Sequence, residues 1–384
     1  MALLPARARS LWLRVHRWLG LGLGLVFVLL GLTGSLLVFY TDIDAAIEPA
    51  LSRPDPAPVV TSWQTVLDAL QRTHPQRDRG WRIELPPDGR GLVTARYLKP
   101  AETAGAFFAP LLVTINPTDG RVLANRFWGD FAATWVLDLH YMLLAGDSGR
   151  MAVGVLGLLM LLSLVGGLVL WWPRRGHWRD ALRLKLAGSR QRRHYDLHKL
   201  AGVGGGVVLL VLALTGAALA LPDWVEPAIK RMSPPLPMPA PEAARDSTRP
   251  LITLDDALAR ARARFPEGIA RWVDTPSASG SIYRVRLWLP GAPSQRFPRS
   301  YVWIHAQTGE VLAVRDARQE SAGDTLLAWL HPLHNGEAFG LPGRLLACVA
   351  GVLPLMLVVT GVQRWLDRRR ARTRRSSPAA LDRP

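Results

Sequence analysis

The chain has 384 residues, of which 49% are hydrophobic and 20% charged, and its formal net charge is +17. This composition excludes a disordered or fibrous chain. The basic charge alone would suggest nucleic acid binding, but four uncharged windows exclude that class, because each has the ~20 residues with which a helix crosses a bilayer. The windows are residues 18–40, 151–173, 200–222 and 345–363.

In chain order, the windows predict an alternation of membrane spans and polar segments. The predicted segments are a cytoplasmic arm (1–17), a first span (18–40), an outer domain (41–135), an interfacial segment with the second span (136–173), a cytoplasmic loop (174–199), a third span (200–222), a second outer domain (223–329), an interfacial segment with the fourth span (330–363) and a cytoplasmic tail (364–384). Each outer domain reads as an amphipathic helix followed by alternating strand-like runs and a hairpin. The predicted fold class is a membrane protein with an all-α four-helix core and two outer α+β domains.

The basic excess predicts the topology. The arm, the loop 174–199 and the tail carry 4, 9 and 8 basic residues against 0, 2 and 2 acidic residues, whereas the two long segments 41–150 and 223–344 are balanced, with 26 of each. The positive-inside rule therefore places both termini and the loop in the cytoplasm. The outer domains then lie in the periplasm, if the protein resides in a bacterial inner membrane. We expect the first window to be retained rather than cleaved as a signal peptide, because its apolar run is long for one.

The chain also reads as a tandem duplication. The first and third windows align at a constant offset of 182, and the second and fourth at a constant offset of 194, without a gap. The alignment pairs His16 with His198, Thr33-Gly34 with Thr215-Gly216, His140 with His334, and Arg150 with Arg344. The repeated unit is helix, outer domain, helix. Both copies start inside, so the repeat is parallel.

The paired histidines are the candidate ligands of a cofactor. His16 and His198 begin spans at the cytoplasmic side, and His140 and His334 precede spans at the outer side. Ionisable residues at apolar helix ends are seldom kept without a function. A histidine followed by a strip of glycines suits a flat porphyrin, and two such pairs predict two bis-histidine haem b sites per chain. No C-x-x-C-H motif accompanies the single cysteine, Cys348, so a covalently attached haem is excluded.

Other interpretations of these residues stay open. Small residues also serve helix packing, and histidine pairs could serve metal-ion transport or a proton path. Transport is the less favoured reading, because the windows predict no broken helix and contain no charge. His331, one turn before His334, could replace it as a ligand or contact a substrate. Arg150 and Arg344 could bind haem propionates, or anchor their helices at the interface.

Several motifs resemble the PepSY-associated transmembrane family, which includes PiuB-like proteins and FoxB-type ferric-siderophore reductases. They are His16-Arg-Trp-Leu-Gly20, His198-Lys-Leu-Ala-Gly202, His331-Pro-Leu-His334-Asn-Gly336, Thr360-Gly361 and Trp171-Trp172-Pro173. The outer segments look like PepSY domains. The resemblance implies a dihaem enzyme that passes electrons from the His16/His198 site to the His140/His334 site and reduces a ferric siderophore or chelate outside.

The resemblance leaves the donor and two alternatives open. The cytoplasmic segments are too short for a flavin or nucleotide domain, so the donor would be a separate reductase or a membrane quinol. The first alternative is a non-enzymatic PepSY module that binds or regulates an envelope protein. The second is a siderophore transporter. Beyond the haem ligands, no catalytic residue is predicted.

Overall fold

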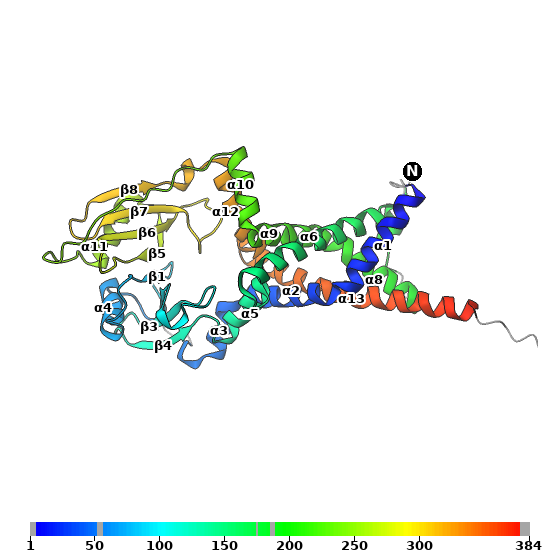
Figure 1. Ribbon diagram of the computed structural model, residues 1–384, viewed down its shortest axis with the longest axis horizontal. Helices are drawn as coiled ribbons and strands as arrows, with labels where there is room; N and C mark the ends of the chain where they lie inside the picture. Colours follow the sequence, from blue (N-terminus) through cyan, green and yellow to red (C-terminus); the bar gives the residue numbers. More distant parts are fainter. Residues whose placement is uncertain (1–4, 52–56, 174–175, 185–188, 377–384) are drawn as a thin grey trace, which may run out of the picture.

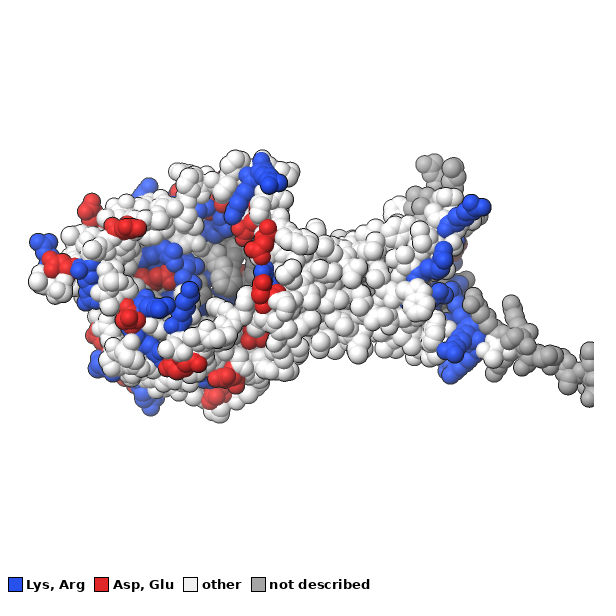
Figure 2. All heavy atoms as spheres, in the orientation of Figure 1, with Lys and Arg blue, Asp and Glu red and all other residues white. Residues whose placement is uncertain are grey.

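The molecule is a helical stalk joined to a lobe built on one β-sheet (Figure 1). The computed structural model describes residues 5–51, 57–173, 176–184 and 189–376, so the predicted arm, loop and tail lie partly outside the described residues. The stalk contains α1 (Ala6–Gly22), α2 (Gly24–Leu37), α6 (Gly146–Trp171), α8 (Arg190–Gly204), α9 (Gly206–Ala220) and α13 (Gly340–Ser376). On the face seen in Figure 2, the stalk carries no charged side chain between the lobe and its basic far end. This surface is that of a membrane protein.

Two of the four predicted spans are bent. Gly146–Trp171 and Glu337–Ala371 are long and apolar enough to cross a membrane, whereas α1–α2 and α8–α9 qualify only as pairs bent by 63° and 57°. The prediction of unbroken helices over 18–40 and 200–222 was therefore wrong. Clustered glycines weaken the helix at both bends. A Cβ on Gly205 would also lie 1.9 Å from the Leu353 side chain of α13, so a larger residue there would have to displace that side chain.

The lobe contains a single antiparallel sheet rather than two separate domains. Its strands are β1 (Arg82–Glu84), β2 (Val93–Tyr97), β3 (Leu111–Ile115), β4 (Val122–Phe127), β5 (Ile269–Asp274), β6 (Ile282–Trp288), β7 (Ser300–His305) and β8 (Val311–Arg315), in the order β4-β3-β2-β1-β5-β6-β7-β8. The two halves join where β1 pairs with β5, with Arg82 opposite Asp274. This corrects the prediction of two separate outer domains. Alone, one half would expose β1 and the other β5 as an unpaired edge strand, and the pairing of β1 with β5 removes these two edges.

One hydrophobic core spans both halves of the lobe. The helices α4 (Trp63–Thr73) and α11 (Leu254–Arg264) pack on one face of the sheet, and residues of both repeats form a single buried cluster. The helices also cap each other, since Asp255 accepts hydrogen bonds from the Trp63 and Gln64 amides at 2.9 and 3.1 Å, while Gln64 Oε1 accepts from the Leu254 amide at 2.8 Å. The lobe is therefore one packed unit.

Shorter elements connect the lobe to the stalk. They are α3 (Tyr40–Ile47), α5 (Ala132–Met142), α7 (Trp178–Leu182), α10 (Pro222–Met232), α12 (Ala322–His334) and the 3₁₀ turns η1 (Pro49–Leu51), η2 (Ala101–Thr103), η3 (Ala317–Gln319) and η4 (Glu337–Phe339). Of these, α5 and α12 matter most for the site. Each ends at the junction of lobe and stalk (Figure 1), and α5 contacts α2 while α12 contacts α9.

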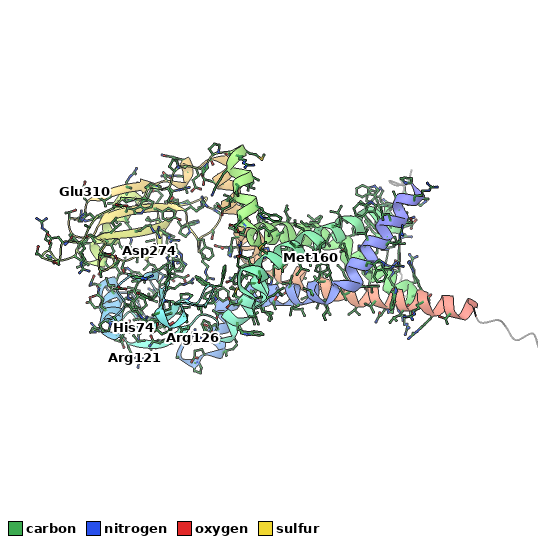
Figure 3. All side chains as sticks on the ribbon, in the orientation of Figure 1. His74, Arg121, Arg126, Met160, Asp274 and Glu310 are labelled. Atoms are coloured by element: carbon green, nitrogen blue, oxygen red, sulfur yellow. The ribbon has the colours of Figure 1, made fainter. Side chains whose placement is uncertain are left out.

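The second face of the sheet is rich in arginine. Along β6, alternate residues enter the core, which leaves Arg284 and Arg286 on the opposite face. Both guanidinium groups bond Asp274 on the neighbouring strand, with shortest distances of 2.7 and 3.4 Å, and Arg82 bonds it at 2.5 Å. Figure 3 labels Asp274 on the sheet, inside the lobe. Burial would raise the pKa of Asp274, but Arg82, Arg286 and Arg284 outweigh it and hold that pKa below its usual value.

Replacing Asp274 with asparagine is expected to lower the free energy of unfolding of the lobe by about 3 kcal/mol, because three arginines lose one shared partner. Thermal unfolding followed by tryptophan fluorescence measures the change. A carboxylate whose pKa is lower in the folded than in the unfolded protein contributes its full stabilisation of the fold above the unfolded-state pKa, about 3.9. The difference between wild type and variant should therefore vanish as the pH falls through the folded pKa. Asp130→Asn, at an exposed position, is the control. Equal stability of the two variants at neutral pH would refute the stabilising role of Asp274.

Candidate functional site

The structure brings the outer histidines together. His140 lies near the end of α5 and His334 is the last residue of α12, and their ring centroids are 6.1 Å apart. They come from different copies of the repeat. Both side chains line a cavity at the junction of stalk and lobe. The pair therefore lies where the membrane helices meet the sheet domain.

The inner histidines form a second pair within the stalk. His16 of α1 and His198 of α8 have ring centroids 6.2 Å apart and nearly perpendicular rings. Each lies before the bend of its helix pair. The structure thus contains two histidine pairs of nearly equal separation, one at the lobe and one toward the basic end of the stalk.

All four imidazoles are held at Nδ1 by a neighbouring helix. The contacts are His16 Nδ1 with Ser163 O at 2.9 Å, His198 Nδ1 with Leu357 O and Thr360 Oγ1 at 3.0 Å each, His140 Nδ1 with Thr33 Oγ1 at 3.0 Å, and His334 Nδ1 with Leu212 O at 3.0 Å and Thr215 Oγ1 at 3.2 Å. The hydroxyl group of each buried threonine donates its hydrogen bond to a carbonyl oxygen one turn back in the same helix, at 2.6–2.7 Å. Each threonine oxygen can then only accept, so Nδ1 carries the proton and Nε2 keeps its lone pair for a ligand bond.

A glycine lies beneath each ring. A Cβ on Gly34, Gly216, Gly167 or Gly361 would lie 3.0, 2.7, 3.2 or 3.5 Å from Cε1 of His140, His334, His16 or His198, respectively. Gly34 and its repeat partner Gly216 thus make room for a histidine of another helix. The repeat pairs Thr33 with Thr215, but the roles of the threonines and of the Ser163 carbonyl as acceptors from histidine Nδ1 were not predicted.

The spacing of the rings fits one metal ion between each pair. With a metal–nitrogen bond of about 2.0–2.1 Å and a ring nitrogen about 1.1 Å from the ring centre, two axial imidazoles have centroids about 6.3 Å apart. Among the described residues, no group of three or more His, Cys, Asp or Glu side chains could hold a metal ion. Two imidazoles alone make an incomplete site for a bare ion. Two imidazoles could complete the coordination of an iron whose other four donors belong to a macrocycle.

The cavity at the outer pair has a volume of about 1460 Å³. Its stalk end is lined by small residues, among them Gly31, Ala213 and Gly351, and its lobe end by Arg96 and Arg296. Ligand sites commonly measure about 300–1,000 Å³. The cavity therefore has room for a flat apolar macrocycle and for a second molecule beside it.

The remaining predicted site residues also line this cavity. His331 packs its ring edge-on against Phe297, with centroids 4.9 Å apart, whereas His334 is the residue that faces His140. Arg150 donates to the Ala220 carbonyl at the end of α9, and Arg344 to the Val38 carbonyl just after α2, at 3.1 and 2.7 Å. Both arginines also pair with aspartates, at 2.6 and 3.5 Å. Each thus joins two helices at the level of the outer pair.

Comparison with known proteins agrees with this architecture. The chain is 29% identical over 257 residues to the uncharacterized protein PA4219 of Pseudomonas aeruginosa, a match that covers 61% of this chain and 63% of the relative. The chain thus matches somewhat less than two thirds of that relative's length. The model of the family described as the PepSY-associated TM region matches residues 13–368, which include both histidine pairs and the whole sheet. The protein therefore belongs to the family of the PepSY-associated TM region.

Proposed function

We propose that the protein is an inner-membrane dihaem oxidoreductase of the ferric-siderophore reductase type, with haem b held by His16/His198 and by His140/His334. The observation that carries the proposal is the presence of two imidazole pairs at 6.1 and 6.2 Å with every Nδ1 bonded elsewhere. Bound haem would supply reversible one-electron chemistry at an iron without an open coordination position.

The chain's own residues would orient the ligands and keep them in one tautomer. Thr33, Thr215 and Thr360 would accept a hydrogen bond from Nδ1 and so leave the Nε2 lone pair for a ligand bond. The small and apolar residues at the stalk end of the cavity would exclude water from the macrocycle. A fixed, dry site of this kind suits electron transfer better than the binding of an exchangeable ligand.

The acceptor would be a ferric chelate that enters the lobe end of the cavity. Each Fe(III) gains one electron and becomes Fe(II), and the electron comes from a quinol or a separate reductase on the far side of the membrane. The charge distribution supports this direction, because the basic segments predict that the inner histidine pair lies toward the cytoplasm. The cavity connects the outer pair with the lobe, so an acceptor need not enter the bilayer.

A second candidate function, transport of the chelate, is favoured by one observation. Transporters often have discontinuous helices, and α1–α2 and α8–α9 are bent by 63° and 57°. The backbone at the bends nevertheless stays hydrogen-bonded, since the Leu23 and Gly205 amides donate to Leu19 O and Ala201 O at 2.9 and 3.0 Å. The bends therefore expose neither of these amides for a substrate.

Reconstituted vesicles separate the two functions. With a quinol and its reductant inside and ferric chelate outside, a membrane-impermeant ferrous indicator should develop colour outside, and His334→Ala should abolish the colour. The same vesicles, given labelled chelate without a donor, should accumulate none. Accumulation without a donor would establish transport instead, and absence of ferrous iron from haem-loaded vesicles would refute the reductase.

A further inference from the structure

The cavity above the outer histidine pair has an excess of positive charge. Its lining includes the arginines Arg96, Arg150, Arg271, Arg296 and Arg344 but only two carboxylates, Glu84 and Glu337. Figure 2 shows the lobe hollowed on the face in view, with basic side chains inside the hollow. Arginines in a confined space repel one another unless anions balance them.

The two carboxylates neutralise the arginines of the lobe end only in part. Glu337 accepts from Ser294 Oγ and from the amides of Gln295 and Arg296, at 2.8–3.1 Å, so its oxygens are occupied by neutral donors. Glu84 is shared, with one oxygen 3.4 Å from Arg96 Nη2 and the other 3.8 Å from Arg296 Nε. A single partly engaged carboxylate thus serves two arginines.

Two guanidinium groups keep an unused donor. The Nε atoms of Arg96 and Arg296 are buried and have no hydrogen-bond partner among the described residues. The planar group of Arg96 is held by Trp272 and Trp128, whose ring centroids lie 4.8 and 5.9 Å away. Unpaired buried donors are costly, so the hydrogen-bonding capacity of these two guanidinium groups is not fully used.

A third arginine of the cavity makes no ion pair. Arg271 donates to two backbone carbonyls, Gln295 O at 3.1 Å and Leu85 O at 2.6 Å, and no carboxylate of the described residues lies within 4.0 Å of it. Burial lowers the pKa of both Arg96 and Arg271 below the usual arginine value. The positive form of these side chains is thus incompletely compensated by the residues around them.

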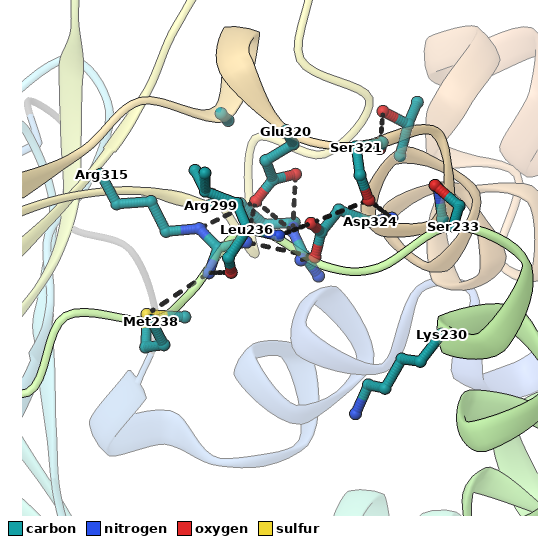
Figure 4. Close-up of polar contacts among 12 residues, drawn as sticks. Lys230, Ser233, Leu236, Met238, Arg299, Arg315, Glu320, Ser321 and Asp324 are labelled. Carbon is teal, nitrogen blue, oxygen red and sulfur yellow. Dashed lines mark hydrogen bonds and ion pairs between the residues drawn. The ribbon is translucent and has the colours of Figure 1, made fainter.

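One other cluster of buried arginines in the lobe is balanced by carboxylates. Figure 4 shows Arg315 and Arg299 bonded to Glu320 and Asp324, two cations with two anions, with contacts from 2.7 to 3.2 Å. That cluster ties α12 to the sheet and needs no further partner. The arginines that line the cavity lack such a balance, as do the three arginines that share Asp274.

We propose that Arg96, Arg271 and Arg296 form a site for ferric chelates of net negative charge, such as iron held by citrate or other carboxylates. This inference rests on the proposed reductase function and gives the substrate class of the same cavity. Carboxylate oxygens suit the planar, forked donors of arginine. A cationic hydroxamate complex would instead add charge to an already positive space.

Binding of redox-inert gallium analogues tests the charge preference without any electron transfer. The full-length, haem-loaded protein in nanodiscs is titrated with gallium(III) citrate and with a gallium(III) trishydroxamate that carries a free ammonium group. Calorimetry should show at least about tenfold tighter binding of the citrate complex. Its affinity should also fall as the salt concentration rises. Equal or tighter binding of the cationic complex would overturn the proposal.

Variants locate the site. Arg96→Gln and Arg296→Gln should each weaken gallium citrate binding by about tenfold, and Arg296→Lys, which keeps the charge, should weaken it less. Arg318→Gln is the control, because this exposed arginine pairs with Asp316 and Glu267 outside the cavity. Haem spectra of each variant report whether it has folded. Wild-type affinity in both folded glutamine variants would refute the site.

The two proposals fail in different ways. If gallium citrate does not bind while ferric chelates are still reduced, the charge preference is wrong and the reductase stands. If gallium citrate binds and no ferric chelate is reduced, the anion site stands and the reductase is wrong.

Discussion

Replacing His334 with alanine is expected to halve the haem content of the purified protein. The substitution removes one of two imidazoles that face each other at 6.1 Å, while the inner pair lies on other helices, α1 and α8. A haem iron bound by two histidines would keep only one protein ligand after the substitution, so the protein would bind the haem more weakly. Haem per chain from extracted pigment, together with the reduced-minus-oxidised spectrum, measures the effect.

His331→Ala is the matched control for this prediction. His331 lies one helical turn earlier on α12 and lines the same cavity, but its ring contacts Phe297 instead of His140. The control should therefore retain both haem groups. Loss of haem in His331→Ala with full haem in His334→Ala would mean that His331 is the outer ligand. Full haem in both variants would contradict the outer site.

Gly216→Val is expected to destroy the outer site without touching a ligand. A Cβ at this position would lie 2.7 Å from Cε1 of His334, closer than van der Waals contact allows. The valine must displace the ring, so the Thr215 hydrogen bond at 3.2 Å and the facing of the two imidazoles are lost together. Overpacking of this kind typically costs about 1–3 kcal/mol. The variant should thus show the half haem content of His334→Ala.

Gly204→Val controls for the cost of valine in a glycine-rich helix. Gly204 is exposed, and a Cβ there meets nothing within 4 Å. This variant should keep both haem groups and the wild-type spectrum. If Gly216→Val also kept both, the ring would have another stable position, and the close contact would have no part in holding the site.

The sequence predicted the histidine pairs because the chain is duplicated. The constant offsets identified His16, His198, His140 and His334 as equivalent residues, and residues at equivalent depth on parallel helices can meet. The same offset of 194 relates the carbonyls of Ser163 and Leu357, which accept from His16 and His198. A repeat therefore carries information about pairing, although the ligand role itself stays a prediction.

Features that depend on tertiary contact could not be predicted. Strand alternation indicates strand-like runs in each outer segment but not that β1 pairs with β5, because edge-to-edge pairing depends on the approach of the two halves. The close approach of Leu353 to Gly205 comes from another helix. The arginine-rich cavity collects Arg96 from β2, Arg271 from β5 and Arg296 from a loop, which are far apart in sequence.

The number of haem groups per chain tests the central claim most directly. Full-length protein is purified in detergent, its haem is extracted and quantified against protein by amino-acid analysis, and the reduced-minus-oxidised spectrum identifies the haem type. Two b-type haem groups per chain is the predicted result, one for each histidine pair. One haem per chain would contradict one of the two sites, and a colourless protein would contradict the proposed function altogether.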